Sequence, residues 1–209
     1  MRTCLYILIG YLSGSILFAN VFSALFHEKG AIEESKDKNP GTANAFLYGG
    51  FRCGVLTLIC DLGKGILPVH FYLTGSRPEE AAALSLALVL AEGVLAAPVV
   101  GHICSAYHNF KGGKGIAVTF GSLLGMFPDL RPALLLAFFF LFYSLILRIT
   151  PHFYRTLVTY LCTMVGLFFV PCQPGVRAGF FLISLAVLLH FHFSKEEREQ
   201  FQVKLLWMH

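Results

Sequence analysis

The run TCLYILIGYLSGSILFANVFSALF (residues 3–26) contains no charged side chain. A helix needs about 20 consecutive, mostly apolar residues to cross the hydrocarbon core of a bilayer. The run is longer than the apolar core of a signal peptide, and no small-residue cleavage pattern follows it. We therefore predict that residues 3–26 form a membrane span.

The composition of the whole chain extends this prediction. Of its 209 residues, 56% are hydrophobic and 13% are charged, and the mean hydropathy is +0.69. Because a soluble domain of this size is less apolar, lipid is the best explanation for the surplus. We predict an all-α polytopic integral membrane protein with a single membrane-embedded domain over residues 1–209.

The cysteines are scattered, mostly inside apolar runs, and show no CxxC or Cys/His metal-binding spacing. Cysteines of this kind behave as small buried hydrophobic residues in a reducing compartment. We therefore expect no disulfide framework, no metal site and no cofactor. The six are Cys4, Cys53, Cys60, Cys104, Cys162 and Cys172.

Seven apolar segments follow from the pattern, and we expect about seven transmembrane helices. They cover residues 3–26, 50–73, 81–104, 116–127, 133–147, 156–172 and 179–193. The fourth is too short to cross a bilayer and begins directly after a group of glycines. It therefore predicts a short or half-spanning helix that starts inside the protein, where irregular backbone is tolerated because it lines a cavity.

The basic residues of the loops and termini fall unequally on the two sides of this arrangement. The side of the first polar loop holds ten of them and the other side holds four. Because cytoplasmic loops carry the excess of Lys and Arg, we expect the N-terminus outside the plasma (cytoplasmic) membrane and the C-terminus in the cytoplasm. The ten are Lys29, Lys36, Lys38, Lys111, Lys114, Arg148, Arg155, Lys195, Arg198 and Lys204, and the four are Arg2, Arg77, Arg131 and Arg177.

The most unusual stretch is FKGGKGIA (residues 110–117), which holds three glycines and two lysines. Consecutive glycines let successive backbone N–H groups point into one concavity that suits an anion. A helix that starts near Gly115 adds its unsatisfied N–H groups, and Lys111 and Lys114 add full charges. This pattern favours phosphate binding, although a Gly-rich cytoplasmic turn is the alternative. It is not a Walker A loop, since Ile116 stands where a magnesium-binding Ser or Thr is needed.

Two further stretches carry polar groups next to apolar runs. In KNPGTANAF (residues 38–46), turn residues precede Thr42 and Asn44, which by themselves are typical of an ordinary helix N-cap. In DLGKG (residues 61–65), Asp61 and Lys64 are three apart and can pair on one helix face. Such a pair inside a span indicates either a functional site or a structural ion pair, and Glu92 in the third span raises the same question.

Three histidines lie near the predicted cytoplasmic boundary. His102 precedes the glycines, and His190 and His192 end the last span. A histidine at a membrane boundary is more often an interfacial hydrogen-bonding group than a catalyst. No histidine has Asp at the fifth position after it, as the HxxxxD arrangement of many glycerolipid acyltransferases requires, and no GxSxG nucleophile elbow occurs.

Three stretches together resemble one enzyme family. GHICSAYHNFKGGKGIAVTFG (residues 101–121) is similar to the central signature of the bacterial acyl-phosphate:glycerol-3-phosphate acyltransferases, the PlsY family. NPGTAN (residues 39–44) resembles its first signature, and DLGKG matches a D-x-x-K-G segment that follows. The resemblance implies a seven-span, N-out fold. It also implies transfer of an acyl chain from acyl phosphate to position 1 of sn-glycerol 3-phosphate, which gives lysophosphatidic acid and phosphate without a coenzyme A thioester.

The resemblance also implies roles for individual residues, with acyl phosphate, glycerol 3-phosphate and the lipid bilayer as partners and no nucleic acid. Gly112, Gly113 and Lys114 would hold the acyl-phosphate headgroup, and Thr156 would replace a serine hydroxyl. With His102, these are the expected catalytic residues. The expected substrate-binding residues are Asn39, Gly41, Thr42, Asn44, Arg52, Lys111, Gly115, His190 and His192.

The chain departs from the family pattern mainly in the first and third signatures. Asp37 stands where the first signature has Ser, and Leu47 stands where it has Arg, for which Arg52 is a substitute. The third signature, HxxN, has no clear counterpart in HFHFSKEERE (residues 190–199). Two alternatives therefore remain: a diverged member with another acceptor or a non-catalytic binding protein, and a small transporter.

Overall fold

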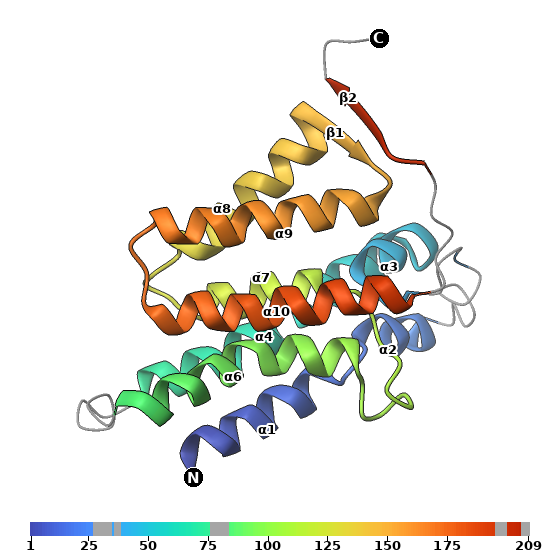
Figure 1. The fold of residues 1–209 in the computed structure, drawn as a ribbon. Coiled ribbons are helices and arrows are strands. Elements are labelled where there is room, and N and C mark those ends of the chain that lie inside the picture. Colours follow the sequence, from blue (N-terminus) through green and yellow to red (C-terminus); the bar gives the residue numbers. More distant parts are fainter. Residues whose placement is uncertain (27–34, 36–38, 76–83, 195–199, 206–209) are drawn as a thin grey trace.

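The computed structural model describes residues 1–26, 35, 39–75, 84–194 and 200–205, and these residues form a bundle of helices that lie side by side (Figure 1). For residues 84–92 and 174 only the backbone is described. The helices are α1 (Arg2–Gly14), α2 (Phe18–Leu25), α3 (Thr42–Tyr48), α4 (Gly50–Thr74), α6 (Leu84–Ile103), α7 (Ile116–Leu124), α8 (Arg131–Leu141), α9 (His152–Phe169) and α10 (Pro174–Phe193). A π-helical turn (Phe142–Ile146) extends α8.

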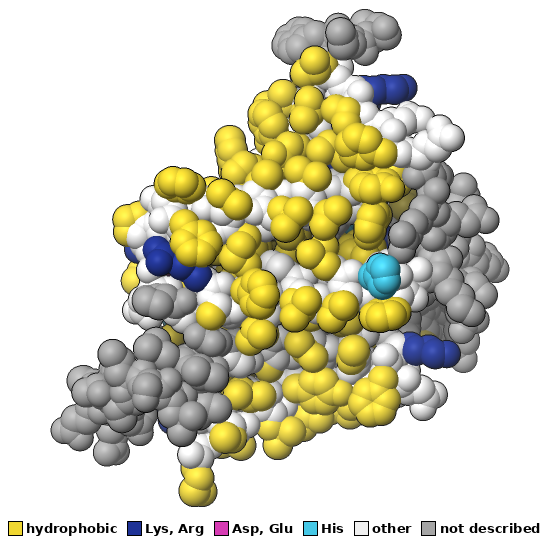
Figure 2. Space-filling view, in the orientation of Figure 1, with side chains coloured by type: hydrophobic (Ala, Val, Ile, Leu, Met, Phe, Trp, Pro, Cys, Tyr) yellow, Lys and Arg dark blue, Asp and Glu magenta, His cyan; other side chains and the backbone are white. Residues whose placement is uncertain are grey.

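The surface of the bundle is that of a membrane protein. Among the described residues, three helical stretches are long and apolar enough to cross a bilayer: Arg2–Leu25, Gly50–Thr74 and Gly175–Phe193. Figure 2 shows hydrophobic side chains over most of the described part of the face formed by α1, α6, α10 and α9, with Lys and Arg toward its edges. Each of the seven predicted segments contains a helix, and the predicted helical membrane fold is confirmed.

The first predicted span is not one continuous helix. It breaks between Gly14 and Phe18, which separates α1 from α2. The carbonyl groups exposed by the break are satisfied by polar groups from elsewhere: Lys64 Nζ donates to Ile16 O at 2.6 Å and Ser105 Oγ donates to Ser15 O at 2.6 Å. A broken helix is tolerated at membrane depth because the protein supplies these partners.

Small residues let two pairs of helices approach closely. A Cβ at Gly14 of α1 would collide with the backbone of Pro98 in α6, and a Cβ at Gly121 of α7 would collide with the backbone of Leu62 in α4. Glycine at such contacts is typical of helix packing in membranes, where van der Waals contact replaces the hydrophobic effect. These contacts fix α1 against α6 and α7 against α4.

The short helix α7 begins where the glycines predict. Its N-cap, Gly115, has φ of +75°, a left-handed conformation that favours glycine. The helix runs only from Ile116 to Leu124 and packs against α4, α6 and α8. Tyr160 of α9 donates a hydrogen bond to Thr119 Oγ1 at 3.0 Å, so α7 is held from several sides and its N-terminal turn is rigidly placed.

One short pair of strands interrupts the otherwise helical described chain. After the π-helical turn the chain forms β1 (Leu147–Thr150), which pairs antiparallel with β2 (Gln202–Leu205). Leu147 lies opposite Leu205, although the sequence pattern assigns Leu147 to a span. The β-branched Ile149 and Thr150 favour this extended segment, which ends at Pro151 before α9.

Candidate active site

The glycine loop, residues 111–115, is tethered by two groups that are distant in sequence. Gly113 N donates to His102 O at 3.0 Å, and Lys114 N donates to Asn39 Oδ1 at 3.1 Å. The structure therefore brings the NPGTAN stretch and the glycine loop together. It also changes the expected anion nest, because the amides of Gly113 and Lys114 are already engaged in holding the loop.

The donors that remain for an anion come from the start of α7. Within the described chain, the amides of Gly115, Ile116 and Ala117 have no acceptor, because the first backbone bond of this helix runs from Thr119 N to Gly115 O. These N–H groups and the helix dipole favour negative charge at this point. Lys114 lies directly before them and supplies a positive charge.

Lys114 is half-buried beside α10. Its Nζ lies 5.5 Å from the centre of the Phe191 ring, a cation–π distance. His190, one residue before Phe191, lines a cavity together with Lys111, Gly112 and Ile103, which is next to His102. Three of the predicted site residues therefore surround one region at the ends of α6 and α10.

The first-loop residues make contacts other than those of a helix cap. The N-cap of α3 is Gly41 and has no side-chain cap hydrogen bond, so the interpretation of Thr42 and Asn44 as ordinary capping residues was wrong. Asn44 Nδ2 instead donates to Asn39 O at 2.9 Å and to Ser35 Oγ at 3.1 Å, and Thr42 Oγ1 donates to Asp61 Oδ2 at 3.3 Å. These bonds tie the first loop to α4.

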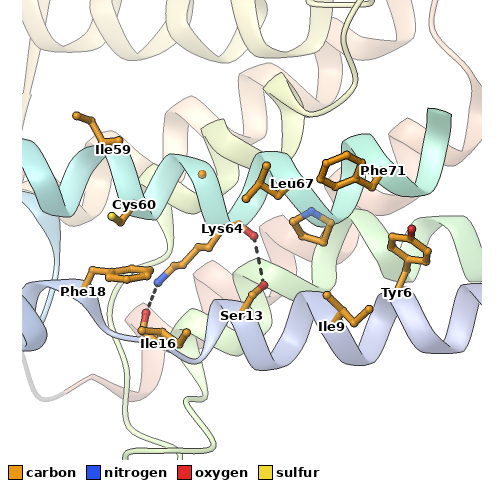
Figure 3. Close-up of a pocket in the computed structure, with 12 residues that line it drawn as sticks. Tyr6, Ile9, Ser13, Ile16, Phe18, Ile59, Cys60, Lys64, Leu67 and Phe71 are labelled. Carbon is orange, nitrogen blue, oxygen red and sulfur yellow. Dashed lines mark hydrogen bonds between the residues drawn. The ribbon is translucent and has the colours of Figure 1, made fainter. Parts of the chain in front are cut away.

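Asp61 and Lys64 pair as their spacing predicts, and the pair is almost inaccessible. The Lys64 Nζ to Asp61 Oδ1 distance is 2.9 Å, and the side chains are 3% and 1% exposed. Lys64 Nζ also lies 2.8 Å from His102 Nδ1. Figure 3 shows the Lys64 side chain extending from α4 toward the α1–α2 break, beside Phe18.

Two cavities adjoin these residues. One, about 520 Å³ in volume, lies between the glycine loop and the ends of α6 and α10, where Lys111, Gly112 and His190 meet apolar side chains such as Ile103 and Leu189. The other, about 630 Å³, is an apolar groove between α1 and α4 with Lys64 in its wall (Figure 3). The first fits the size of an ordinary ligand pocket and combines apolar walls with polar groups.

Other predicted residues lie in different settings. Thr156 is buried, and its Oγ1 donates to His152 O at 2.9 Å within its own helix. Arg52, in the first turn of α4, and His192 are exposed. Several residues used in the sequence argument lie outside the described structure: Lys29, Lys36, Asp37, Lys38, Arg77, Lys195, Arg198 and the side chain of Glu92.

Sequence reasoning missed the contacts that assemble this region. It did not connect Lys64 with His102, or Asn39 with the Lys114 amide, and it assigned no role to Ser105, which bonds to Ser15 at the helix break. The available signal was the presence of these polar residues within or beside apolar runs, where an unpaired polar group is costly.

Comparison with known proteins gives one consistent family. A family model described as glycerol-3-phosphate acyltransferase matches residues 4–200. A glycerol-3-phosphate acyltransferase of Pseudomonas aeruginosa is 38% identical over 130 residues, which cover 62% of each chain. One of Legionella pneumophila is 39% identical over 119 residues, covering 56% of this chain and 39% of the relative. The alignments thus span less than two thirds of the length of these curated relatives.

Two crystal structures of PlsY (YgiH), an integral membrane glycerol 3-phosphate acyltransferase, have a similar fold. The glycerol 3-phosphate form superposes with a TM-score of 0.73 at 21% identity, covering 92% of this chain and 89% of that chain. The lysophosphatidic acid form gives 0.71 at 22% identity, covering 91% and 88%. At this identity the likeness concerns the fold.

Proposed function

The chain belongs to the glycerol-3-phosphate acyltransferase family, and from that premise we propose that it transfers an acyl chain from acyl phosphate to the 1-hydroxyl of sn-glycerol 3-phosphate. The products are lysophosphatidic acid and phosphate. The observation that carries the proposal is the bond between Lys114 N and Asn39 Oδ1. It joins the two stretches that resemble the family signatures at the N-terminus of a short helix, where a phosphate is favoured.

In the proposed reaction the donor phosphate lies at the first turn of α7, next to Lys114. The hydroxyl oxygen of the acceptor forms an ester bond with the acyl carbon, and the bond between that carbon and the phosphate oxygen breaks. The hydroxyl proton leaves with phosphate, so no side-chain triad is needed. Lys114 and the amides of residues 115–117 stabilise the charge on the leaving phosphate, the largest single contribution expected of such a site.

The acyl chain fits the cavity at the ends of α6 and α10. Lys111, Gly112 and His190 lie at this cavity together with apolar residues that include Val100 and Phe193. An acyl phosphate has the matching character, because it combines a charged headgroup with a long apolar chain. We place Gly112 and Lys111 near the headgroup and the apolar wall along the chain.

A direct assay tests the proposed reaction. Purified protein in lipid nanodiscs, given acyl phosphate and glycerol 3-phosphate, should release inorganic phosphate only together with lysophosphatidic acid. Phosphate release without acyl product, or no release, would contradict the proposal. Repeating the assay with other polyol phosphates identifies the acceptor, which matters because Leu47 replaces the Arg of the first signature.

We also propose that the site lies on the cytoplasmic side of the plasma membrane, with the N-terminus outside. The excess of loop Lys and Arg on that side supports this orientation, and so does the proximity of Asn39, the glycine loop and Phe193. In a background without the native cysteines, Asn109→Cys should react with an impermeant thiol reagent only after lysis, and Ser76→Cys should react in intact cells. Labelling of both positions from the same side would refute the orientation.

A further inference from the structure

The Lys64 ammonium lies close to three polar atoms. Its Nζ lies 2.9 Å from Asp61 Oδ1, 2.6 Å from Ile16 O and 2.8 Å from His102 Nδ1. A lysine ammonium donates hydrogen bonds and has no lone pair with which to accept one. The nitrogen of His102 that faces it must therefore be the accepting one.

This contact determines where the His102 proton lies. A neutral imidazole carries one N–H and one accepting nitrogen. Because Nδ1 accepts from Lys64, the proton belongs on Nε2. A doubly protonated ring would place two cations 2.8 Å apart in a site where His102 is only 2% exposed, and such a contact is strongly unfavourable.

The Nε2 atom faces the glycine loop. A Cβ built on Gly113 would collide with His102 Nε2 and would lie 3.1 Å from Asn39 Oδ1. Gly113 N donates to His102 O, which fixes the two backbones to each other. Among the described residues Nε2 makes no hydrogen bond, so its N–H group points at the loop that precedes α7.

We propose that His102 donates this Nε2–H to a phosphate oxygen bound at the glycine loop, and that Asp61 and Lys64 are positioning residues that hold the ring in the donating tautomer. The proposal rests on the proposed function and adds a donor to its anion site. Asp61 balances the charge of Lys64, so the network is neutral apart from the bound anion. Glycine at position 113 leaves room for the ring to approach the phosphate.

Two substitutions of His102 distinguish a hydrogen-bond donor role of the side chain from a role in packing. Gln places an amide nitrogen near the Nε2 position and keeps a donor toward the loop, whereas Asn reaches only the Nδ1 position. Loss of a hydrogen bond to a charged group changes an equilibrium by about 10- to 100-fold. We expect His102→Gln to keep kcat/KM for acyl phosphate about 10-fold or more above His102→Asn. His70→Gln and His70→Asn, on the distant part of α4, serve as matched controls and should both match the wild type.

The tautomer itself is measured by nitrogen NMR of ¹⁵N-histidine-labelled full-length protein in nanodiscs. The signal of His102, assigned by its loss in His102→Gln, should show a protonated Nε2 and an unprotonated Nδ1. Lys64→Met should give a mixture of the two tautomers. Adding inorganic phosphate should shift the Nε2 resonance together with the amides of Gly115 and Ile116.

Several results would overturn the proposal. A proton on Nδ1 in the wild type would exclude the donor role, and so would equal activity of His102→Asn and His102→Gln. If phosphate shifts the amides of α7 but not His102 Nε2, the anion site stands and the donor does not. If phosphate shifts neither, both this proposal and the proposed anion site fail. These measurements remain informative even if Lys64→Met does not fold.

Discussion

The glycine loop is held by groups from other parts of the chain, whereas Thr156 in α9 is held by its own helix. The loop depends on Asn39 from the first loop and on His102 from the end of α6. Thr156 donates to the carbonyl of His152, one helical turn earlier. The family resemblance assigns both to the active site, but among the described contacts only those of the loop come from distant parts of the chain.

This difference divides the proposed site into two sides. We call the tethered glycine loop with Lys114 the preformed side, and the acceptor residues, which include Arg52 and Thr156, the unformed side. The donors that we propose for the acyl phosphate lie on a loop that is tethered by Asn39 and His102 without substrate, as preorganised electrostatic stabilisation requires. On the acceptor side, Leu47 replaces an expected Arg and is 77% exposed, and Arg52 is exposed as well. We infer that acceptor groups take their final positions only with glycerol 3-phosphate bound. Substitutions on the preformed side should therefore cost more activity.

The largest effect is expected at Lys114. Lys114→Ala removes the charge next to the leaving phosphate and should lower kcat/KM by about 10²- to 10³-fold. Lys114→Arg should not restore activity, because the guanidinium differs in shape and hydration from the ammonium. Formation of lysophosphatidic acid is the measurement, with membrane insertion and size-exclusion profile as controls. Near-normal turnover of Lys114→Ala would show that the Lys114 charge does not stabilise the leaving phosphate, and would contradict the larger effect expected on the preformed side.

The next effect concerns the space at Gly113. A Cβ there collides with the His102 ring, so Gly113→Ala should displace the loop and lower kcat/KM by about 10- to 100-fold. Gly63→Ala is the matched control, because a Cβ at Gly63 meets no atom within 4 Å. Both variants are assayed under the same conditions as the wild type. Equal activity of the two alanine variants would show that the loop adapts.

Local patterns account for what the sequence predicts well. The helices follow from apolar runs, the start of α7 follows from the glycines, and the Asp61–Lys64 pair follows from a spacing of three on one helix face. Each of these features depends on neighbouring residues only. Taken alone, the local pattern at Thr42 and Asn44 favours a cap. It cannot indicate the bond from Thr42 to Asp61, which spans 19 positions.

Contacts between distant parts of the chain account for the features that the sequence does not predict. The break between α1 and α2 is stabilised by Lys64, 48 positions from Ile16, and by Ser105, 90 positions from Ser15. The Asn39–Lys114 bond spans 75 positions. Strand β2 pairs with β1, from which it is separated in the sequence by α9 and α10. No periodicity in one sequence encodes such partners, so these features emerge only from the structure.

A smaller effect is expected at Thr156, on the unformed side. Thr156→Val removes a hydroxyl whose hydrogen bonds, among the described residues, lie within its own helix. Loss of one neutral hydrogen bond corresponds to about 3- to 10-fold. If this hydroxyl turns toward the acceptor, the variant should raise KM for glycerol 3-phosphate by that factor and leave KM for acyl phosphate unchanged. Thr156→Ser should match the wild type. A rise in KM for acyl phosphate instead would assign Thr156 to the preformed side.

The smallest effect is expected beyond the far end of α7, where Asp129 and Arg131 form an exposed pair. Hydrogen bonds from the Arg131 guanidinium hold the pKa of the Asp129 carboxyl below its ordinary value of 3.8. A lowered pKa in the folded state stabilises the fold above the unfolded value, and this contribution is lost as the pH falls through the folded pKa. Because water screens an exposed pair, Asp129→Asn should move the thermal midpoint at pH 7 by no more than about 1 °C. The variant and the wild type should converge further below pH 3.8, and activity should be unchanged. A large loss of activity in Asp129→Asn would mean that the glycine loop responds to distant surface changes, and its sensitivity to Gly113→Ala would then not report on local tethering.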